Sequence, residues 1–296
     1  MEEEIIELEE KEENRKKKDK KKGHKKMTAI IISILVVIAL SFIYVRYIAT
    51  MGFIVKEYNV TNEKIPESFN GFKIAHLSDI HYASMGKNKL DKVVQEVNIM
   101  KPDLIVFTGD LYDRFSNLTD DMREKIIDSL SKLEAPLGKY AISGNHDYEH
   151  DGYQEIIEKC GFTYLHNESK LIYYNGNDPI ELVGYPSIIK DQPDYNIELT
   201  DNYKIALIHE GDAVDNLIDK DINLALAGHS HGGQIRIPLI GPLGFSLPEY
   251  AKKYPNEHYT INKTELYVSY GLGESEYYIR AFNKPSFNFY RLYNKK

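Results

Sequence analysis

Cysteine is almost absent from this 296-residue chain, which contains a single one, Cys160. One cysteine cannot close an intramolecular disulfide, and its isolation excludes a cysteine-rich zinc site. Any bound metal must therefore be held by histidine, aspartate or asparagine side chains. The lack of disulfides leaves the cellular compartment open.

A basic stripe is also lacking. The net charge is -8, and the first 26 residues hold ten Lys/Arg against nine Asp/Glu, so all of the net negative charge belongs to the rest of the chain. An acidic domain repels phosphate backbones, which argues against a nucleic-acid partner and makes a nuclease the least favoured activity. Bound metal could still attract one phosphate. Nothing in the sequence indicates a protein partner.

The N-terminus divides into a charged tail, residues 1–26, and an apolar segment, residues 27–49. The tail buries too little apolar surface to offset its ordering entropy, so we expect it to be disordered. A helix over 2–13 is the alternative, since Ile5, Ile6 and Leu8 could pack weakly. Met27–Val45 has 19 residues without charge, which as a helix span roughly 28 Å, about one bilayer core.

This apolar segment is predicted to be a single-pass anchor in the cell membrane. Tyr44 and Tyr47 stand where interfacial aromatics are expected, and the lysine-rich flank should stay in the cytoplasm, leaving residues after about 50 outside. A buried core helix is one alternative. A cleaved signal peptide is the stronger one, although no A-x-A cleavage site stands near Ala49.

Residues 50–296 form the predicted catalytic domain, in which apolar runs of strand and helix type alternate. Two amphipathic helices are predicted around residues 90–100, before Pro102, and 122–133. Residues 170–174 and 180–183 are predicted to form a strand pair. The other expected strands are 53–60, 72–77, 104–108, 140–143, 204–208, 224–227, 265–269 and 287–292. No internal repeat and no long linker interrupts this pattern.

Five of the apolar runs end in polar clusters, and together these clusters are the most informative feature of the chain. Ligands bind beyond the carboxyl ends of strands in open α/β sheets, so we expect the five clusters to lie along one rim. The clusters are Asp79-Ile80-His81, Gly109-Asp110-Leu111-Tyr112-Asp113-Arg114, Gly144-Asn145-His146-Asp147, His209 and Gly228-His229-Ser230-His231-Gly232-Gly233.

Carboxylates, imidazoles and an amide oxygen together suit manganese, iron or zinc ions. Glycine precedes Asp110, Asn145 and His229, where it lets the backbone turn sharply and approach a bound group. A carboxylate such as Asp110 can bridge two cations roughly 3.5–4 Å apart, and such a pair activates hydroxide and neutralises phosphoryl oxygen. Taken singly, each cluster could be an ordinary turn or surface loop; their joint occurrence favours a two-metal site.

The set resembles the calcineurin-like metallophosphoesterase superfamily, and within it a membrane-anchored bacterial branch. The last metal motif of that branch reads G-H-x-H-G-G-Q-[IV]-R-x-P, and here Gly228–Pro238 reads GHSHGGQIRIP. The resemblance covers residue 50 to the C-terminus. It implies an α/β fold, a four-layer α/β/β/α sandwich, preceded here by one transmembrane helix.

The resemblance also assigns roles. Asp79, His81 and His231 would hold one metal ion, and Asn145, His209 and His229 the other, with Asp110 as the bridge. His146 would act near the leaving-group oxygen as general acid or transition-state stabiliser. Asp113 would orient His146, Arg114 would contact phosphate or brace its loop, and Asp147 would serve as a supporting or turn residue.

Two departures from the family pattern bear on the substrate. The segment after His209 reads HEGD, where many relatives have H-x-P-D, and the ligand survives. Relatives often carry S-R-G-x-G near the C-terminus, where this chain has Tyr270 in place of the arginine. If that arginine contacts substrate, its task is lost or passes to Arg280.

The implied activity is metal-dependent hydrolysis of a phosphoester or phosphoanhydride, with a metal-bridging hydroxide attacking phosphorus in line. The anchor brings lipid headgroups within reach, and the apolar segment 238–247 directly follows the metal motif. Either it packs as an ordinary loop, or it flanks a lipid-linked phosphate. A UDP-2,3-diacylglucosamine-type pyrophosphohydrolase and a metal-binding module without turnover are the alternatives. The intact Asp110, Asn145 and His146 argue against the second.

Overall fold

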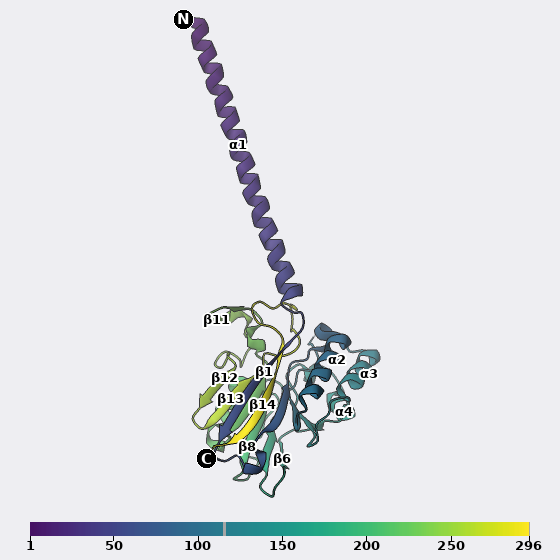
Figure 1. Ribbon diagram of the computed structural model, residues 1–296. Helices are drawn as coiled ribbons and strands as arrows, with labels where there is room; N and C mark the ends of the chain where they lie inside the picture. The colour runs from purple at the N-terminus through teal and green to yellow at the C-terminus, as the bar shows by residue number, and fades with distance from the viewer. Residues whose placement is uncertain (115–116, 296) are drawn as a thin grey trace. The chain divides into compact units, whose positions relative to one another are not determined.

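The computed structural model describes residues 1–114 and 117–295, and these form two compact units. The first unit is Met1–Ile48 and the second begins at Ala49. Figure 1 shows the first as one long helix and the second as a domain of sheets flanked by helices.

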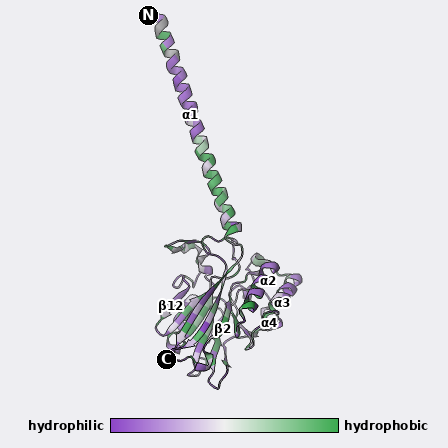
Figure 2. Cartoon of the chain, viewed as in Figure 1, coloured by the Kyte–Doolittle hydropathy of each residue, from purple (hydrophilic) through white to green (hydrophobic). Residues whose placement is uncertain are grey.

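The first unit consists of α1 (Glu2–Ile43) and a short π-helical turn, Tyr44–Ile48. The charged tail is therefore helical, and the expectation of disorder is wrong for the described structure. Lysine and glutamate are good helix formers, and ion pairs four residues apart stabilise exposed helices. Such pairs join Lys11 to Glu7, Lys16 to Glu12 and Lys17 to Glu13. Figure 2 shows the change from a hydrophilic to a hydrophobic half along α1.

By length and composition, the helical stretch Ile5–Ile48 could cross a membrane, with a mean hydropathy of 2.8 in its most apolar window. None of that window is buried against the described part of the protein. The segment therefore does not behave as a buried core helix. Its composition is equally compatible with an anchor and with a signal sequence.

The first sheet of the domain has the strand order β1-β14-β2-β3-β4-β5. Strands β2 to β5 run parallel, β14 is antiparallel to β2, and β1 is parallel to β14. The bounds are β1 (Ile54–Asn62), β14 (Ser286–Asn294), β2 (Phe72–Leu77), β3 (Leu104–Phe107), β4 (Lys139–Ala141) and β5 (Thr163–Tyr164).

The second sheet has the strand order β12-β13-β9-β8-β7-β6, with a parallel centre and antiparallel outer strands. The predicted strand pair is confirmed as β6 against β7. The bounds are β12 (His258–Ile261), β13 (Thr264–Val268), β9 (Leu224–Gly228), β8 (Tyr203–Glu210), β7 (Ile180–Gly184) and β6 (Glu168–Ile172).

Three apolar clusters show how the layers stack. Strand side chains alternate between faces, so on β2 Ala75 packs toward α2, α3 and α4, whereas Ile74 packs between the two sheets. A third cluster joins the outer face of the second sheet to the 3₁₀ segment η4. The bounds are α2 (Tyr82–Met100), α3 (Asp120–Leu130), α4 (Tyr153–Lys159) and η4 (Gly211–Lys220).

The domain thus has the expected layered α/β architecture, with η4 supplying the fourth layer. The polar clusters lie along one rim, as expected, but two sheets form that rim. Strands β2, β3 and β4 belong to the first sheet and β8 and β9 to the second. Because both sheets are covered on both faces, their central strands are all continuous apolar runs, and the sequence pattern does not distinguish one sheet from two.

Candidate metal centre

The seven candidate ligands meet where the two sheets finish at the same end of the domain. Asp79 follows β2, Asp110 follows β3 and Asn145 comes shortly after β4. From the second sheet, His209 lies near the end of β8, while His229 and His231 follow β9. The ligands are buried, apart from a partly exposed Asn145.

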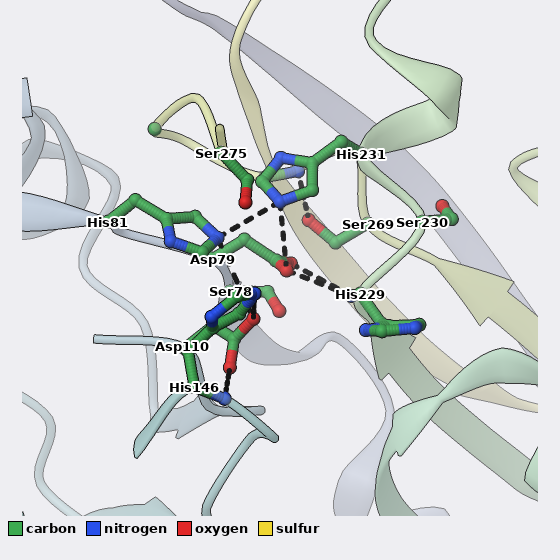
Figure 3. A network of polar contacts seen from close by, with 12 residues as sticks. Ser78, Asp79, His81, Asp110, His146, His229, Ser230, His231, Ser269 and Ser275 are labelled. Atoms are coloured by element: carbon green, nitrogen blue, oxygen red, sulfur yellow. Dashed lines mark hydrogen bonds and ion pairs between the residues drawn. The ribbon is translucent and has the colours of Figure 1, made fainter. Parts of the chain in front are cut away.

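Asp79, His81 and His231 form one group, with one ligand atom from each within 4.8 Å of the others. The Nε2 atoms of the two histidines are 3.0 Å apart, and His231 Nε2 is 3.5 Å from Asp79 Oδ1. Figure 3 shows these side chains converging on one point. Two imidazole nitrogens and a carboxylate oxygen facing one another in this way provide three corners of a metal site.

Asp110, His209 and His229 form the second group, by the same distance criterion. His209 Nδ1 donates to the Thr108 carbonyl at 2.6 Å, and His229 Nε2 donates to the Glu249 carbonyl at 2.7 Å. A carbonyl oxygen only accepts, so the contacting nitrogen of each ring carries a proton, and in the neutral ring the other nitrogen is the one free to bind a metal ion. Such backbone contacts set the orientation and tautomer of metal-binding histidines.

Asp110 lies between the two groups. Its Oδ2 atom is 3.2 Å from His209 Nε2 and 3.6 Å from His81 Nε2. The Oδ1 atom of Asn145 is buried without a hydrogen-bond partner, and the Nε2 atom of His209 faces the Asp110 carboxylate. Because buried polar atoms are nearly always paired, the unpaired amide oxygen beside a central carboxylate fits a site for metal ions.

Backbone strain is concentrated at the ligands. The φ angles are 50° at Asp79, 40° at His81, 59° at Asp110, 65° at His229 and 48° at His231. This left-handed region is uncommon for residues other than glycine, and such strain persists only where the surroundings enforce it. At Gly144 no side chain fits at all, because a Cβ there would lie 2.6 Å from the ring of His209 and against the Asp110 carboxylate.

Asp147 enforces part of this backbone. Its Oδ2 accepts hydrogen bonds from the N–H groups of Asp110 and Gly144, and its Oδ1 accepts one from Leu111, each at 2.8 Å. One buried carboxylate therefore fastens the loop after β3 to the loop after β4. This agrees with the supporting role expected for it.

Asp113 does not stand where the sequence analysis expected it. Its Oδ1 lies 3.2 Å from Nδ1 of His81, on the side of that ring away from His231. Asp113 thus supports a candidate ligand, and the expectation that it orients His146 is wrong. The backbone N–H groups of His81 and Tyr82 donate to the carbonyls of Asp110 and Leu111, and these bonds hold the loop that leads to Asp113 beside His81.

His146 lies beside the two groups. Its backbone N–H donates to Asp110 Oδ1 at 2.9 Å, and its Nε2 is 3.8 Å from Asp110 Oδ2. Its side chain is 13% exposed, so one part of the ring reaches the cavity described below.

Burial and charge set the protonation of these groups in opposite directions. Burial lowers the pKa of His146 to about 4, although Asp110 opposes the shift. Burial would raise the pKa of Asp110, but the surrounding histidines hold it well below its usual range. Burial, with Asp110 nearby, raises the pKa of Asp147 to about 7. His146 is therefore neutral near pH 7, and Asp110 is an ionised carboxylate.

A cavity of about 500 Å³ opens onto the ligand groups. Arg114 and His146 line it together with Asn145, His229 and His231. The lining also has apolar members, Phe245, Leu247 and three isoleucines, Ile189, Ile235 and Ile279. The loop from Ser275 to Ile279 contributes too; it bears no motif, so the sequence carried no signal for it.

Arg280 is fully buried and lies away from this cavity. Its Nη2 donates to the carbonyls of Tyr270, Gly271 and Gly273, and its Nε is 3.3 Å from Glu274. Arg280 therefore holds the loop that follows β13 against Asp79 and does not replace a substrate-binding arginine. Tyr270 packs its ring under Gly232 of the metal motif.

Comparison with known proteins agrees with this geometry. Residues 72–233, which contain all seven candidate ligands, match the family model described as calcineurin-like phosphoesterase. The chain belongs to the calcineurin-like phosphoesterase family.

Three relatives illustrate the range of this family. An uncharacterised metallophosphoesterase of Bacillus subtilis, YkuE, is 35% identical over 84% of this chain and 88% of its own length. A zebrafish transmembrane protein with a metallophosphoesterase domain is 30% identical, covering 74% of this chain and 52% of that protein. The UDP-2,3-diacylglucosamine pyrophosphatase LpxG of Chlamydia muridarum is 27% identical, covering 75% and 84%. The family is one of phosphoester hydrolases, and this member has two groups of side chains that are suited to metal ions.

Proposed function

We propose that the protein is a membrane-anchored, two-metal phosphoesterase that hydrolyses a lipid-linked phosphoester or phosphoanhydride. The observation that carries the proposal is the composition of the cavity, whose lining includes members of both ligand groups (Asp110, His229 and His231) together with Phe245 and Leu247. A phosphoryl group at the metals would then leave an apolar substituent against these side chains. Pockets of this kind combine a few polar groups with apolar walls.

The residues proposed to hold metal are the seven named above, with Asp110 shared. When bound, two metal ions would activate water and neutralise charge on phosphoryl oxygens. Manganese, iron and zinc all suit these donors. Thr108 and Glu249 fix the orientation of His209 and His229 through their carbonyls, so both rings are in position before any ion arrives.

His146 and Arg114 are the proposed catalytic residues that touch substrate, with Asp113 as a positioning residue. The low pKa of His146 favours the role of hydrogen-bond donor to a developing oxyanion over that of a proton donor. Arg114 lines the same cavity and supplies a fixed positive charge for a phosphoryl oxygen.

We propose further that the N-terminal helix is the anchor, with its lysine-rich end in the cytoplasm and the domain outside. A reporter enzyme that works only outside the cytoplasm should be active when it is fused after the C-terminus. If that reporter is inactive, and one that works only in the cytoplasm is active at the same position, the orientation is the reverse of the one proposed.

The activity is tested with the full chain in detergent micelles, loaded with Mn²⁺, against an aryl phosphomonoester, an aryl phosphodiester and a phospholipid pyrophosphate. Asp110→Asn should abolish turnover, and His146→Asn should lower kcat with metal content unchanged. Two bound metals without turnover on any of these substrates would instead support the non-catalytic metal-binding module.

Substrate class is tested with the double variant Phe245→Ser, Leu247→Ser. It should lose turnover of the lipid substrate and keep turnover of the aryl substrates, because only the apolar wall has changed. Equal loss on all substrates would count against the lipid. The LpxG relative favours a UDP-diacylglucosamine-type pyrophosphate as a second candidate substrate. Its hydrolysis would release one lipid phosphate and one nucleoside monophosphate in each turnover, and both products can be measured.

A further inference from the structure

A small hairpin carries apolar side chains that the described domain does not cover. It consists of β10 (Arg236–Ile237) and β11 (Gly241–Pro242). Leu239 is fully exposed, Ile240 is 76% exposed, and Phe282 nearby is 65% exposed. Ile237 is 38% exposed. We call Ile237, Leu239, Ile240 and Phe282 the hairpin surface; contiguous exposed apolar patches usually mark interaction sites.

The hairpin surface is held in place by polar contacts beneath it. The Arg236 N–H donates to the Ala281 carbonyl at 2.9 Å, which places Phe282 beside the hairpin. The Arg236 guanidinium donates to the Gly232 carbonyl and to Asn256 Oδ1 at 2.9 and 2.8 Å. The exposed tips are therefore presented by a braced base, and they add nothing to the core.

The start of β1 and the hairpin both lie at the end of the domain that carries the candidate metal centre. β1 runs antiparallel to β2, because β1 is parallel to β14 and β14 is antiparallel to β2. β1 therefore begins at the end of the domain where β2 finishes and the candidate metal centre lies. The hairpin lies at that same end, away from β6 and the C-terminus (Figure 1).

Short contacts join the start of β1 to the metal centre. The N–H of Ile54 donates to the Pro285 carbonyl, and the N–H of Ser286 donates to the Gly271 carbonyl, each at 2.9 Å. A Cβ on Gly271 would lie 2.7 Å from the Asp79 Cβ. The chain that enters β1 thus arrives beside a candidate ligand.

Chain length then limits how far a membrane can be from this end. The apolar helical stretch ends at Ile48, and β1 begins at Ile54. The intervening residues, fully extended, reach about 17–18 Å at most. If the helix crosses a bilayer, the start of β1 lies within that distance of the membrane surface, and it belongs to the end of the domain that carries the metal centre and the hairpin surface.

We propose that the hairpin surface inserts into the interface of the bilayer in which the chain is anchored. The proposed occupant is lipid, because the short segment between the apolar helix and β1 keeps this end of the domain close to the bilayer. Insertion would point the mouth of the catalytic cavity toward lipid headgroups. Interfacial insertion of a few apolar side chains reaches roughly 5–10 Å below the headgroups.

The absence of tryptophan from the chain allows a direct test. The full-length protein is reconstituted in phosphatidylcholine nanodiscs with the single substitution Leu239→Trp or, separately, Ile240→Trp. Replacing the lipid with its acyl-brominated form should quench most of the emission of both variants. The matched control is Tyr173→Trp, because Tyr173 is 52% exposed and follows β6 at the opposite end of the domain; its emission should not change.

Two results would overturn the proposal. Emission at residues 239 and 240 that is as insensitive to bromine as that at 173 would show that the hairpin stays in water or, if the emission is blue-shifted, that it packs on protein. Equal quenching at all three positions would show an unoriented domain. Circular dichroism matching that of the parent protein excludes misfolding of a variant. The measurement requires no turnover, so it fails or succeeds independently of the proposed activity.

Discussion

Removal of the Asp147 carboxylate is the perturbation whose cost can be worked out most directly. The side chain is buried and accepts three backbone hydrogen bonds from the loops that carry Asp110 and Asn145. Three buried N–H groups left without partners would cost about 1–3 kcal/mol each. Relief of the buried charge offsets part of this, because the raised pKa shows that burial of the carboxylate is unfavourable, at about 1.4 kcal/mol per unit. From the middle of that sum, about 6 kcal/mol, this relief removes about 4 kcal/mol, so we expect Asp147→Ala to lower the free energy of unfolding by about 2 kcal/mol.

The same change should weaken metal binding. Supporting contacts of this kind are worth about 10–100-fold in metal affinity. Urea unfolding of the detergent-solubilised chain, followed by tyrosine fluorescence, measures stability, and calorimetric titration with Mn²⁺ measures affinity. The control is Asp151→Ala in the exposed end of the same loop, which should stay within about 0.5 kcal/mol of the parent. If Asp147→Ala matches the control in both measurements, the carboxylate does not organise the loops.

Three further substitutions test separate parts of the site. Asp113→Asn should lower affinity for one of two Mn²⁺ ions by about 10–100-fold, since the carboxylate supports His81; loss of kcat with two tightly bound ions would contradict this. Gly109→Ala should abolish folding into a metal-binding form, because φ is 92° and the methyl would collide with the next loop, whereas Gly244→Ala, with open space around it, should be neutral in the same titration. Arg280→Ala should cost about 3–5 kcal/mol in urea unfolding, because it removes the nearer of the two cations beside the buried Glu274 carboxylate and the donor to three carbonyls; a cost below 1 kcal/mol would refute the pairing.

The strands and the ligand set could be predicted well from the sequence, for a physical reason. A buried strand such as β2 is a continuous apolar run, and a polar residue directly after it, here Asp79, marks where the chain leaves the core. That signal is local, so the strand bounds of Phe72–Leu77 are those expected. The start of α2 was harder to predict, because its first residues, from Tyr82, lack the regular apolar spacing that begins at Leu90.

Pairings between distant segments could not be predicted in the same way. The choice of two sheets depends on which strands become neighbours, and the burial pattern of each strand is compatible with either arrangement. The partner of Asp113 depends on the backbone hydrogen bonds that hold its loop beside His81, and these bonds join segments that are distant in the sequence. Arg280 looked available for substrate, but the loop that holds its guanidinium among three carbonyls forms only in the folded domain.

Five candidate ligands sit in the left-handed region, which for each L-residue costs roughly 1–2 kcal/mol. The compensating contacts belong to the protein itself. Asp147 fastens the loops of the first sheet, Arg280 fastens the loop beside Asp79, and Asp79 accepts the backbone N–H of His229 at 2.9 Å across the two sheets. Because these contacts need no bound ion, the ligand geometry is a product of folding, unlike that of zinc fingers, which are unfolded without metal. The strain is therefore held by the two sheets, and an arriving metal finds its ligands already aimed.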